Sequence, residues 1–150
     1  MVPCIEMTDK NIYLVEQRWN SHPCNVHYAR VAIRDVVSRY AGDCLELIEL
    51  AIGEACANAV EHGSPCGSDN YFTLRCGVAP DRGEIVFEVE DEGYEVSLPR
   101  SAMFNLPDDE CEGGRGLYMI NQIMDDVAVL TSARGLIVRM TKRIPRTSFS

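Results

Sequence analysis

Three polar residues that stand four positions apart, Glu54, Asn58 and His62, could together bind a metal ion and phosphate. Residues at this spacing lie on one face of a helix, about 6 Å from one another. An apolar stripe within residues 48–59 runs beside this row, so the polar side chains lie at the edge of a buried face. Groups at such an edge are partly desolvated, which suits metal and phosphate binding. The same spacing also occurs on ordinary solvated helices, so the row alone leaves both interpretations open.

A carboxylate and a glycine, Asp91 and Gly93, follow a predicted strand at residues 84–90. A carboxylate at the end of a strand can accept a hydrogen bond from the exocyclic amine of a base. A glycine two residues later lets the backbone approach a flat ring. The same Asp-x-Gly pattern is more often only a turn, so a simple turn remains the alternative interpretation.

A glycine-rich segment, Gly113 to Leu117, stands where a third helix is predicted to begin. Free backbone N–H groups at the start of a helix form an anion site, and glycines allow a close approach. Arg115 could add a charge-assisted hydrogen bond to a phosphate. A glycine-rich helix start is also a common end to a loop, so this segment by itself does not decide the function.

The elements that carry these motifs alternate between helix and strand. The polar row lies on a predicted helix for which Asp43 is a plausible N-cap and Gly63 the stop. A helix over residues 26–40, ending at Gly42, precedes it, and a helix over residues 116–124 follows the glycine-rich segment. Alternating or apolar runs predict strands at residues 12–15, 71–78, 84–90, 127–130 and 136–142.

Length and composition predict one soluble domain over residues 1–150, with a core at about 12–143 and a frayed tail at 144–150. No run of about 18 apolar residues could span a membrane, and the start lacks the features of a secretory signal. Seven cysteines without a CxxC pair favour a reduced cytoplasm over a disulfide framework or a zinc site. The net charge of −9 argues against a nucleic-acid partner.

Taken in order, the three motifs resemble the ATP-binding fold that type II topoisomerases, heat-shock chaperones, histidine kinases and mismatch-repair ATPases share. Within that group, the chain is most similar to the bacterial anti-sigma factor serine/threonine kinases. Residues 54–63 resemble their N box, residues 89–93 their first glycine box and residues 113–120 their second. The similarity runs from about Pro23 to Arg143. It implies a two-layer α+β sandwich of the Bergerat type, with a mixed, mostly antiparallel sheet covered on one face by about three helices.

The resemblance also implies roles for the helical row and for the long segment at residues 94–112. Asn58 would hold Mg²⁺ against the phosphates of ATP, and Glu54 would be the catalytic residue that orients or deprotonates the attacking hydroxyl. His62 would contact phosphate or orient the site, although a hydrogen-bonded histidine at a helix end is the more ordinary interpretation. Residues 94–112 would form a lid over the nucleotide.

The glycine boxes would bind the rest of the nucleotide. Asp91 would accept a hydrogen bond from the adenine amine, and Gly93 would make room for the ring. The phosphates would lie in a cradle formed by the start of the third helix: Gly114, Arg115, Gly116 and Leu117.

Two departures from the family pattern concern this part of the site. Glu95 stands where the first glycine box often has a second glycine. Leu136 and Ile137 stand where a threonine commonly lies near the adenine. Loss of that hydroxyl could weaken nucleotide binding by about 1 kcal/mol.

The function that the resemblance implies is an ATP- and Mg²⁺-dependent serine/threonine-protein kinase that acts as an anti-sigma factor. It would phosphorylate a small antagonist protein and sequester a sigma factor. Relatives of this type commonly dimerise, so the amphipathic helix at residues 26–40 could serve a homodimer, although the chain's own sheet could equally bury its apolar face. The alternative is a nucleotide-gated binding module without kinase activity. A detached histidine-kinase domain and a metal or redox cysteine protein are weaker hypotheses, because no acceptor-histidine helix pair and no clustered cysteines are present in the sequence.

Overall fold

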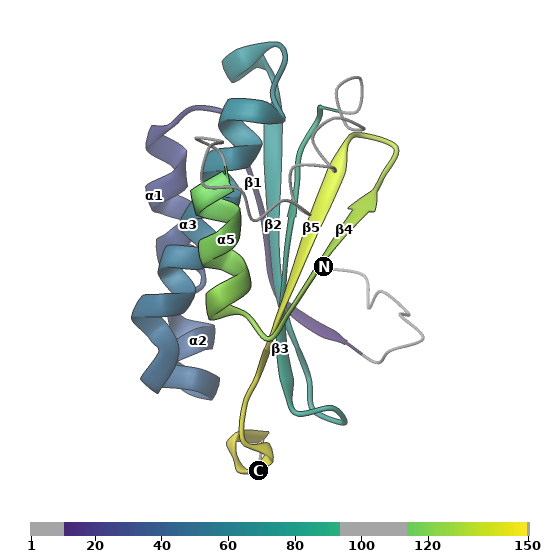
Figure 1. Ribbon diagram of the computed structural model, residues 1–150. Coiled ribbons are helices and arrows are strands. Elements are labelled where there is room, and N and C mark those ends of the chain that lie inside the picture. Colours follow the sequence, from purple (N-terminus) through teal and green to yellow (C-terminus); the bar gives the residue numbers. More distant parts are fainter. Residues whose placement is uncertain (1–10, 94–113, 150) are drawn as a thin grey trace.

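The computed structural model describes residues 11–93 and 114–149. In this part of the chain, five strands form one sheet in the order β1-β2-β3-β5-β4, and the helices cover one of its faces (Figure 1). This arrangement confirms the expected two-layer α+β sandwich. The resemblance implies a mixed, mostly antiparallel sheet, and every strand pairing in the described part is antiparallel. The expected lid lies outside the described residues.

The strands lie where the sequence predicts them, with one correction. The first strand is predicted only over residues 12–15, but β1 continues to Asn20 because it pairs with β2 along its whole length. Polar side chains on the edge strand hide this continuation from a pattern based on apolar alternation. The bounds are β1 Ile12–Asn20, β2 Tyr71–Ala79, β3 Glu84–Glu90, β4 Asp126–Thr131 and β5 Leu136–Arg143.

Apolar side chains on the central strands build the core between the sheet and the helices. Phe87 of β3 stands in register with Cys76 of β2 and Met140 of β5, and all three side chains are fully buried. Ile48 and Ile52 of the longest helix belong to the same buried cluster. Each such side chain contributes about 1.5–3 kcal/mol through burial. The core therefore fixes the longest helix firmly against the sheet.

The second layer consists of helices, and α3 lies in its middle. This helix packs against α1, α2 and α5, and it is the helix that carries the polar row (Figure 1). No helix in residues 11–93 and 114–149 is long and apolar enough to cross a bilayer. The bounds are α1 Cys24–Ala32, α2 Arg34–Ala41, α3 Leu45–His62 and α5 Gly114–Ile123, with short 3-10 helices η1 Gly42–Cys44, η2 Gly67–Asp69 and η4 Arg146–Phe149.

Two predictions at the start of the helical layer are wrong. The single helix predicted over residues 26–40 is two helices, because the backbone turns at Ile33, whose φ is −95° and ψ −4°. Ile33 is fully buried, so tertiary packing fixes this break. Asp43 is not an N-cap, since it lies within η1 and α3 begins at Leu45 without a side-chain cap hydrogen bond.

The end of the described chain contacts the rest of the fold. Ile144 is buried, and its backbone N–H donates to the carbonyl of Gly83 at 2.9 Å. The following residues form η4, and the ring of Phe149 lies 5.3 Å from the ring of Tyr40. The described part of the tail therefore packs on α2.

Charged side chains occupy the sheet face opposite the helices. Glu88 and Glu90 of β3 are almost fully buried there, and Arg75 of β2 lies within ion-pair distance of both. Arg75 also binds Glu16 at 2.7 Å, and Arg139 binds Glu88 at 2.8 Å. Burial of these carboxylates is tolerated because each has an arginine partner.

Replacing Glu90 with glutamine should lower the free energy of unfolding at neutral pH. It should also make that free energy fall less as the pH is lowered. Burial raises the pKa of Glu90, but hydrogen bonds from Arg75 and Ser132 outweigh it, so the net pKa lies below the usual 4.5. With a lowered folded-state pKa, the stabilisation is present above pH 4.5 and is lost as the pH falls through the folded-state value. We expect Glu90→Gln to lower the free energy of unfolding by about 2 kcal/mol at pH 7.

Urea titrations at pH 7 and pH 3 measure this effect. The difference in unfolding free energy between the two pH values should be smaller in Glu90→Gln than in the wild type. Glu46→Gln, on the exposed surface of α3, is the matched control and should behave as the wild type. An unchanged acid dependence in Glu90→Gln would show that the pair with Arg75 contributes little.

Candidate functional site

Among the three residues of the polar row, Asn58 has the environment that most clearly indicates a ligand contact. It lies on α3 with its side chain half-buried, and its Nδ2 atom is buried without a hydrogen-bond partner in the described part of the chain. Buried polar atoms are almost always hydrogen-bonded in native proteins. An amide left in this state costs free energy unless a ligand completes its contacts. The geometry therefore fits a ligand at Asn58 better than a purely structural role.

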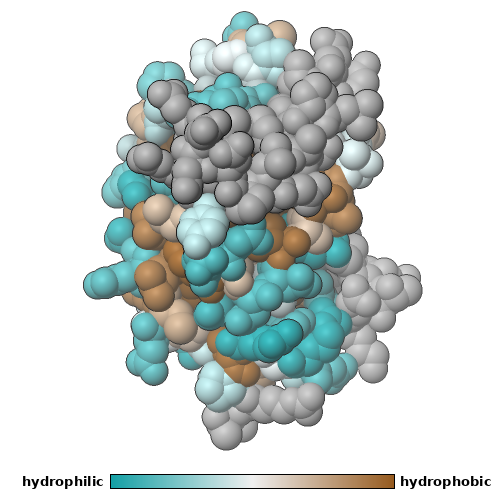
Figure 2. Space-filling model, viewed as in Figure 1, coloured by the Kyte–Doolittle hydropathy of each residue, from teal (hydrophilic) through white to brown (hydrophobic). Residues whose placement is uncertain are grey.

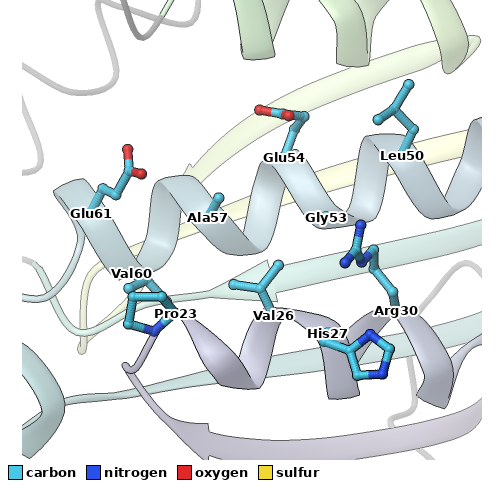
Figure 3. Close-up of a pocket in the computed structure, with 10 residues that line it drawn as sticks. All are labelled: Pro23, Val26, His27, Arg30, Leu50, Gly53, Glu54, Ala57, Val60 and Glu61. Carbon is cyan, nitrogen blue, oxygen red and sulfur yellow. The ribbon is translucent and has the colours of Figure 1, made fainter.

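Glu54 and His62 flank Asn58 by one helical turn on either side. Glu54 is half-exposed and is one of the residues that line a groove between α1 and α3, with its carboxylate directed away from α1 (Figure 3). His62 is the last residue of α3, with 39% of its side chain exposed and its Nε2 atom 3.8 Å from a carboxylate oxygen of Glu61. Both remain accessible to a ligand, and neither is buried as Asn58 is.

Asp91 follows β3 directly and is held by backbone donors. Its Oδ1 atom accepts the N–H of Gly93 at 3.0 Å and the N–H of Leu136 at 3.1 Å. The backbone N–H of Asp91 in turn donates to the carbonyl of Leu136 at 3.0 Å. The carboxylate is only 3% exposed, so these contacts fix its orientation. Asp-x-Gly is thus more than an ordinary turn, because it is anchored to the neighbouring strand.

The hydrogen bond from the Leu136 N–H to Asp91 bears on one departure from the family pattern, the missing threonine near the adenine. Leu136 and Ile137 lack a hydroxyl group, and the side chain of Leu136 is fully buried. The backbone N–H of Leu136 nevertheless reaches the Asp91 carboxylate. The sequence does not predict this donor, because nearly every residue type has the same backbone N–H group.

Two glycines bring other elements close to Asp91. Gly63, directly after α3, lies so near that an added Cβ atom would overlap the Asp91 carboxylate and lie 2.7 Å from its Cβ. Gly63 also accepts the backbone N–H of Glu92 at 3.3 Å. A Cβ atom on Gly135 would lie 2.6 Å from the carbonyl oxygen of Asp91 and 2.7 Å from the nitrogen of Gly93. The end of α3 and the β4–β5 turn therefore meet at this carboxylate.

Replacing Gly135 with alanine should displace Asp91 and weaken nucleotide binding about tenfold, which corresponds to about 1.4 kcal/mol. The added methyl group would meet backbone atoms, so no side-chain rotation can relieve the overlap. Gly42→Ala is the matched control, because a Cβ atom there meets nothing within 4 Å. Isothermal titration with ADP measures both variants. Equal affinities would show that the close approach at Gly135 is not needed to hold Asp91.

The second glycine box is described only in part. The backbone of Gly114, Arg115 and Gly116 forms the first turn of α5, and Gly113 lies outside the described residues. Leu117 is 3% exposed and belongs to the core, so only its backbone could contact a phosphate. The helix α5 packs on α3 and runs in the opposite direction, which places its first turn toward the end where α3 stops (Figure 1).

Comparison with known proteins shows which family has this sequence pattern and fold. The family model of the histidine kinase-like ATPase domain matches residues 20–142. The chain belongs to this family. One curated relative is the serine-protein kinase RsbW of Bacillus subtilis. It is 30% identical to this histidine kinase-like ATPase over 139 residues, which cover 88% of this chain and 86% of the relative. RsbW of Bacillus pumilus is 31% identical over 149 residues, covering 92% of this chain and 90% of the relative.

A solved structure agrees with the fold. The crystal structure of the RsbU and RsbW domains of a Mycobacterium tuberculosis protein has a TM-score of 0.62 at 18% identity, and the match covers 87% of this chain and 31% of that chain. It confirms the predicted fold. The family model and the curated relatives confirm the predicted enzyme class. The histidine kinase-like ATPase is a serine/threonine-protein kinase of the anti-sigma factor group that uses ATP.

Proposed function

We propose that this kinase transfers the terminal phosphate of ATP, with Mg²⁺, to a serine or threonine of a small antagonist protein, and that it also sequesters a sigma factor in the cytoplasm. The observation that carries the proposal is the Nδ2 atom of Asn58, which is buried on the central helix and has no hydrogen-bond partner among residues 11–93 and 114–149. The similarity to serine-protein kinases supports the acceptor class. Pairing through α1 and α2 to form a homodimer is part of the same proposal.

Asn58 is the residue that would hold the metal ion. Mg²⁺ takes oxygen ligands, keeps several waters and needs few protein ligands, so one amide beside phosphate oxygens suffices. When bound, the ion would neutralise the charge that develops on the phosphates during transfer. The fit rests on the Asn58 amide, whose Nδ2 donor has no hydrogen-bond partner among the described residues. A phosphate oxygen would complete that donor, and the Oδ1 atom of the same amide would hold the ion, whereas an asparagine with a purely structural role would have its hydrogen bonds satisfied within the protein.

Asp91 and Gly93 would bind the base, and the first turn of α5 would bind the phosphates. The Asp91 carboxylate is oriented by the N–H groups of Gly93 and Leu136 and is suited to accept the adenine amine. The backbone N–H groups at Gly114 to Leu117 have no partners within the helix and favour anions. Arg115 would add a charge to this cradle, and His62 would contact the phosphates from the end of α3.

Glu54 would act on the acceptor hydroxyl. Its carboxylate lies at the groove between α1 and α3, one turn before Asn58, and so stands between the outer surface and the proposed phosphate site. The serine oxygen would form a bond to the terminal phosphorus while the bond to the leaving ADP oxygen breaks, and the hydroxyl proton would pass to Glu54. Positioning and charge balance carry most of the catalysis in phosphoryl transfer.

Incubation of the pure chain with Mg-ATP and candidate antagonist proteins tests the proposal. Mass spectrometry should locate one phosphate on a serine or threonine of an antagonist, and omission of Mg²⁺ should prevent it. Binding of ATP without transfer to any candidate would contradict the proposed reaction and favour the nucleotide-gated module.

A further inference from the structure

The side chain of Glu92, which lies in the middle of the Asp-x-Gly turn, connects the proposed base site to the edge of the sheet. Its Oε1 atom accepts the backbone N–H of Tyr71 at 2.7 Å and the side-chain amide of Asn70 at 3.3 Å. Its Oε2 atom lies 3.3 Å from Nη2 of Arg18 in β1. The backbone N–H of Glu92 donates to the carbonyl of Gly63 at 3.3 Å. The side chain and the main chain of this residue therefore contact different elements.

The hydrogen bond from Tyr71 takes the place of the next step in the pairing of β2 with β3. The regular pairing ends at Thr73 and Glu90, and the same register would place Tyr71 opposite Glu92. The main chain of Glu92 turns instead toward Gly63, and its carboxylate accepts the N–H of Tyr71. A part-buried backbone N–H without an acceptor would cost free energy. The carboxylate thus lets the turn leave the sheet while β2 stays satisfied.

The residues on either side of Glu92 are held by another strand. The Oδ1 atom of Asp91 accepts the N–H groups of Gly93 and Leu136, at the start of β5. The turn at residues 91–93 is therefore held from β2 on one side and from β5 on the other. Since Asp91 precedes Glu92 directly, a movement of Glu92 relative to Tyr71 also moves the Asp91 carboxylate.

We infer that Glu92 is a positioning residue for nucleotide binding, whose hydrogen bond from the Tyr71 N–H holds the Asp91 carboxylate where it can accept the adenine amine. The inference rests on the proposed function, because it takes Asp91 as the acceptor of that amine. Glu92 itself does not touch the nucleotide. A carboxylate fixed in this way selects adenine over a base with a carbonyl oxygen at the same position, because two acceptors cannot form a hydrogen bond.

The ion pair between Glu92 and Arg18 is secondary to this role. Figure 2 shows polar side chains spread over the visible surface of the described residues, and exposed ion pairs contribute little to stability. The Arg18 side chain is 52% exposed, and its guanidinium carbon lies 4.0 Å from the centroid of the Tyr71 ring. Glu92→Gln would lose the ion pair but keep an oxygen that can accept the N–H of Tyr71. Substitution can therefore separate the two contacts.

Titration of the full chain with ADP and with inosine diphosphate, both with Mg²⁺, tests the inference. Inosine diphosphate has a carbonyl oxygen where ADP has the exocyclic amine. We expect the wild type to bind ADP at least about tenfold more tightly than inosine diphosphate. Glu92→Ala should weaken ADP binding about tenfold and change the affinity for inosine diphosphate by no more than about threefold. Glu92→Gln should keep the preference within about threefold of the wild type.

A second variant and a matched control show whether position is the cause. Glu92→Asp keeps the charge but is one methylene shorter, so its carboxylate cannot reach the N–H of Tyr71 unless the turn moves. It should lower the preference for ADP in the same direction as Glu92→Ala. Glu84→Ala is the control, because Glu84 lies at the other end of β3, pairs with Arg82 at 2.8 Å and has a side chain 20% exposed, against 23% for Glu92. It should keep the preference.

The transfer assay gives a further readout that a general loss of stability would not produce. Glu92→Ala should raise the KM for ATP and leave kcat at saturating ATP nearly unchanged, because Glu92 does not touch the reacting groups. Inosine triphosphate as the phosphate donor should show little change in KM on the same substitution.

The outcomes separate this inference from the proposed function. A preference for ADP that survives in Glu92→Ala and Glu92→Asp, or an equal loss of affinity for both nucleotides, would overturn the inference and leave the proposed function standing. A loss in Glu92→Gln as large as in Glu92→Ala would also overturn it, because the charge would then be responsible. Equal binding of both nucleotides by the wild type would contradict the proposed contact at Asp91 and the inference with it. A preference that depends on Glu92, in a protein that transfers no phosphate, would uphold the inference and count against the proposed kinase reaction.

Discussion

Replacement of Asn58 with alanine should reduce phosphate transfer by about 100- to 1,000-fold, the usual cost of removing one polar group that stabilises a transition state. The amide would hold the metal ion that neutralises the transferring phosphate, and no neighbouring residue of the α3 row can replace an oxygen ligand at that position. Nucleotide binding should also lose its dependence on Mg²⁺. Titration of ADP with and without Mg²⁺, together with a transfer assay, measures both effects.

The same substitution should leave the fold intact. The Nδ2 atom of Asn58 has no hydrogen-bond partner in the described structure, so its removal breaks no bond and relieves a buried unsatisfied group. We expect the unfolding free energy to change by no more than about 1 kcal/mol. Asn121→Ala, on the exposed surface of α5, is the matched control and should retain activity. A loss of several kcal/mol in Asn58→Ala with transfer retained would show that the amide is structural.

Replacement of Glu54 with glutamine should lower kcat by about 100- to 10,000-fold, the range for loss of a general base. The substitution keeps the shape of the side chain, and Glu54 lies outside the proposed contacts to the nucleotide, so the affinity for ATP should not change. Glu46→Gln, an exposed carboxylate on the same helix, should retain the wild-type kcat. Phosphate transfer quenched at set times under saturating ATP gives kcat, and separate nucleotide titrations give the affinity for ATP.

This variant also tests the alternative of a binding module without kinase activity. If Glu54→Gln transfers phosphate at the wild-type rate, Glu54 is not the base and its role is structural. If transfer is lost while partner binding and nucleotide binding persist, Glu54 acts in the chemical step. The position of Glu54 at the groove between α1 and α3, where a partner would approach, favours the second result.

Local pattern was enough to predict the elements that carry the site. The i, i+4 spacing placed Glu54, Asn58 and His62 on one helix, and Gly63 ended that helix as expected. The alternation around Phe87 predicted β3 with its observed bounds. These features depend on neighbours in the sequence, so the sequence alone contains them.

The features that the sequence did not reveal depend on tertiary contacts. The break at Ile33 follows from its burial in the core, and the backbone donor at Leu136 follows from the pairing of β3 with β5. Residue type alone does not show that the close approach of Asp91 and Gly93 requires a glycine at position 135.

A crystal structure of the full chain with Mn²⁺ and a non-hydrolysable ATP analogue tests the central claim most directly. The anomalous signal of the metal should lie roughly 2.2 Å from the Oδ1 atom of Asn58, a normal length for a bond between an oxygen and a hard divalent ion. The adenine amine should lie within hydrogen-bond distance of the Asp91 carboxylate. A metal peak away from Asn58, with that amide still lacking any contact to metal or phosphate, would contradict the account.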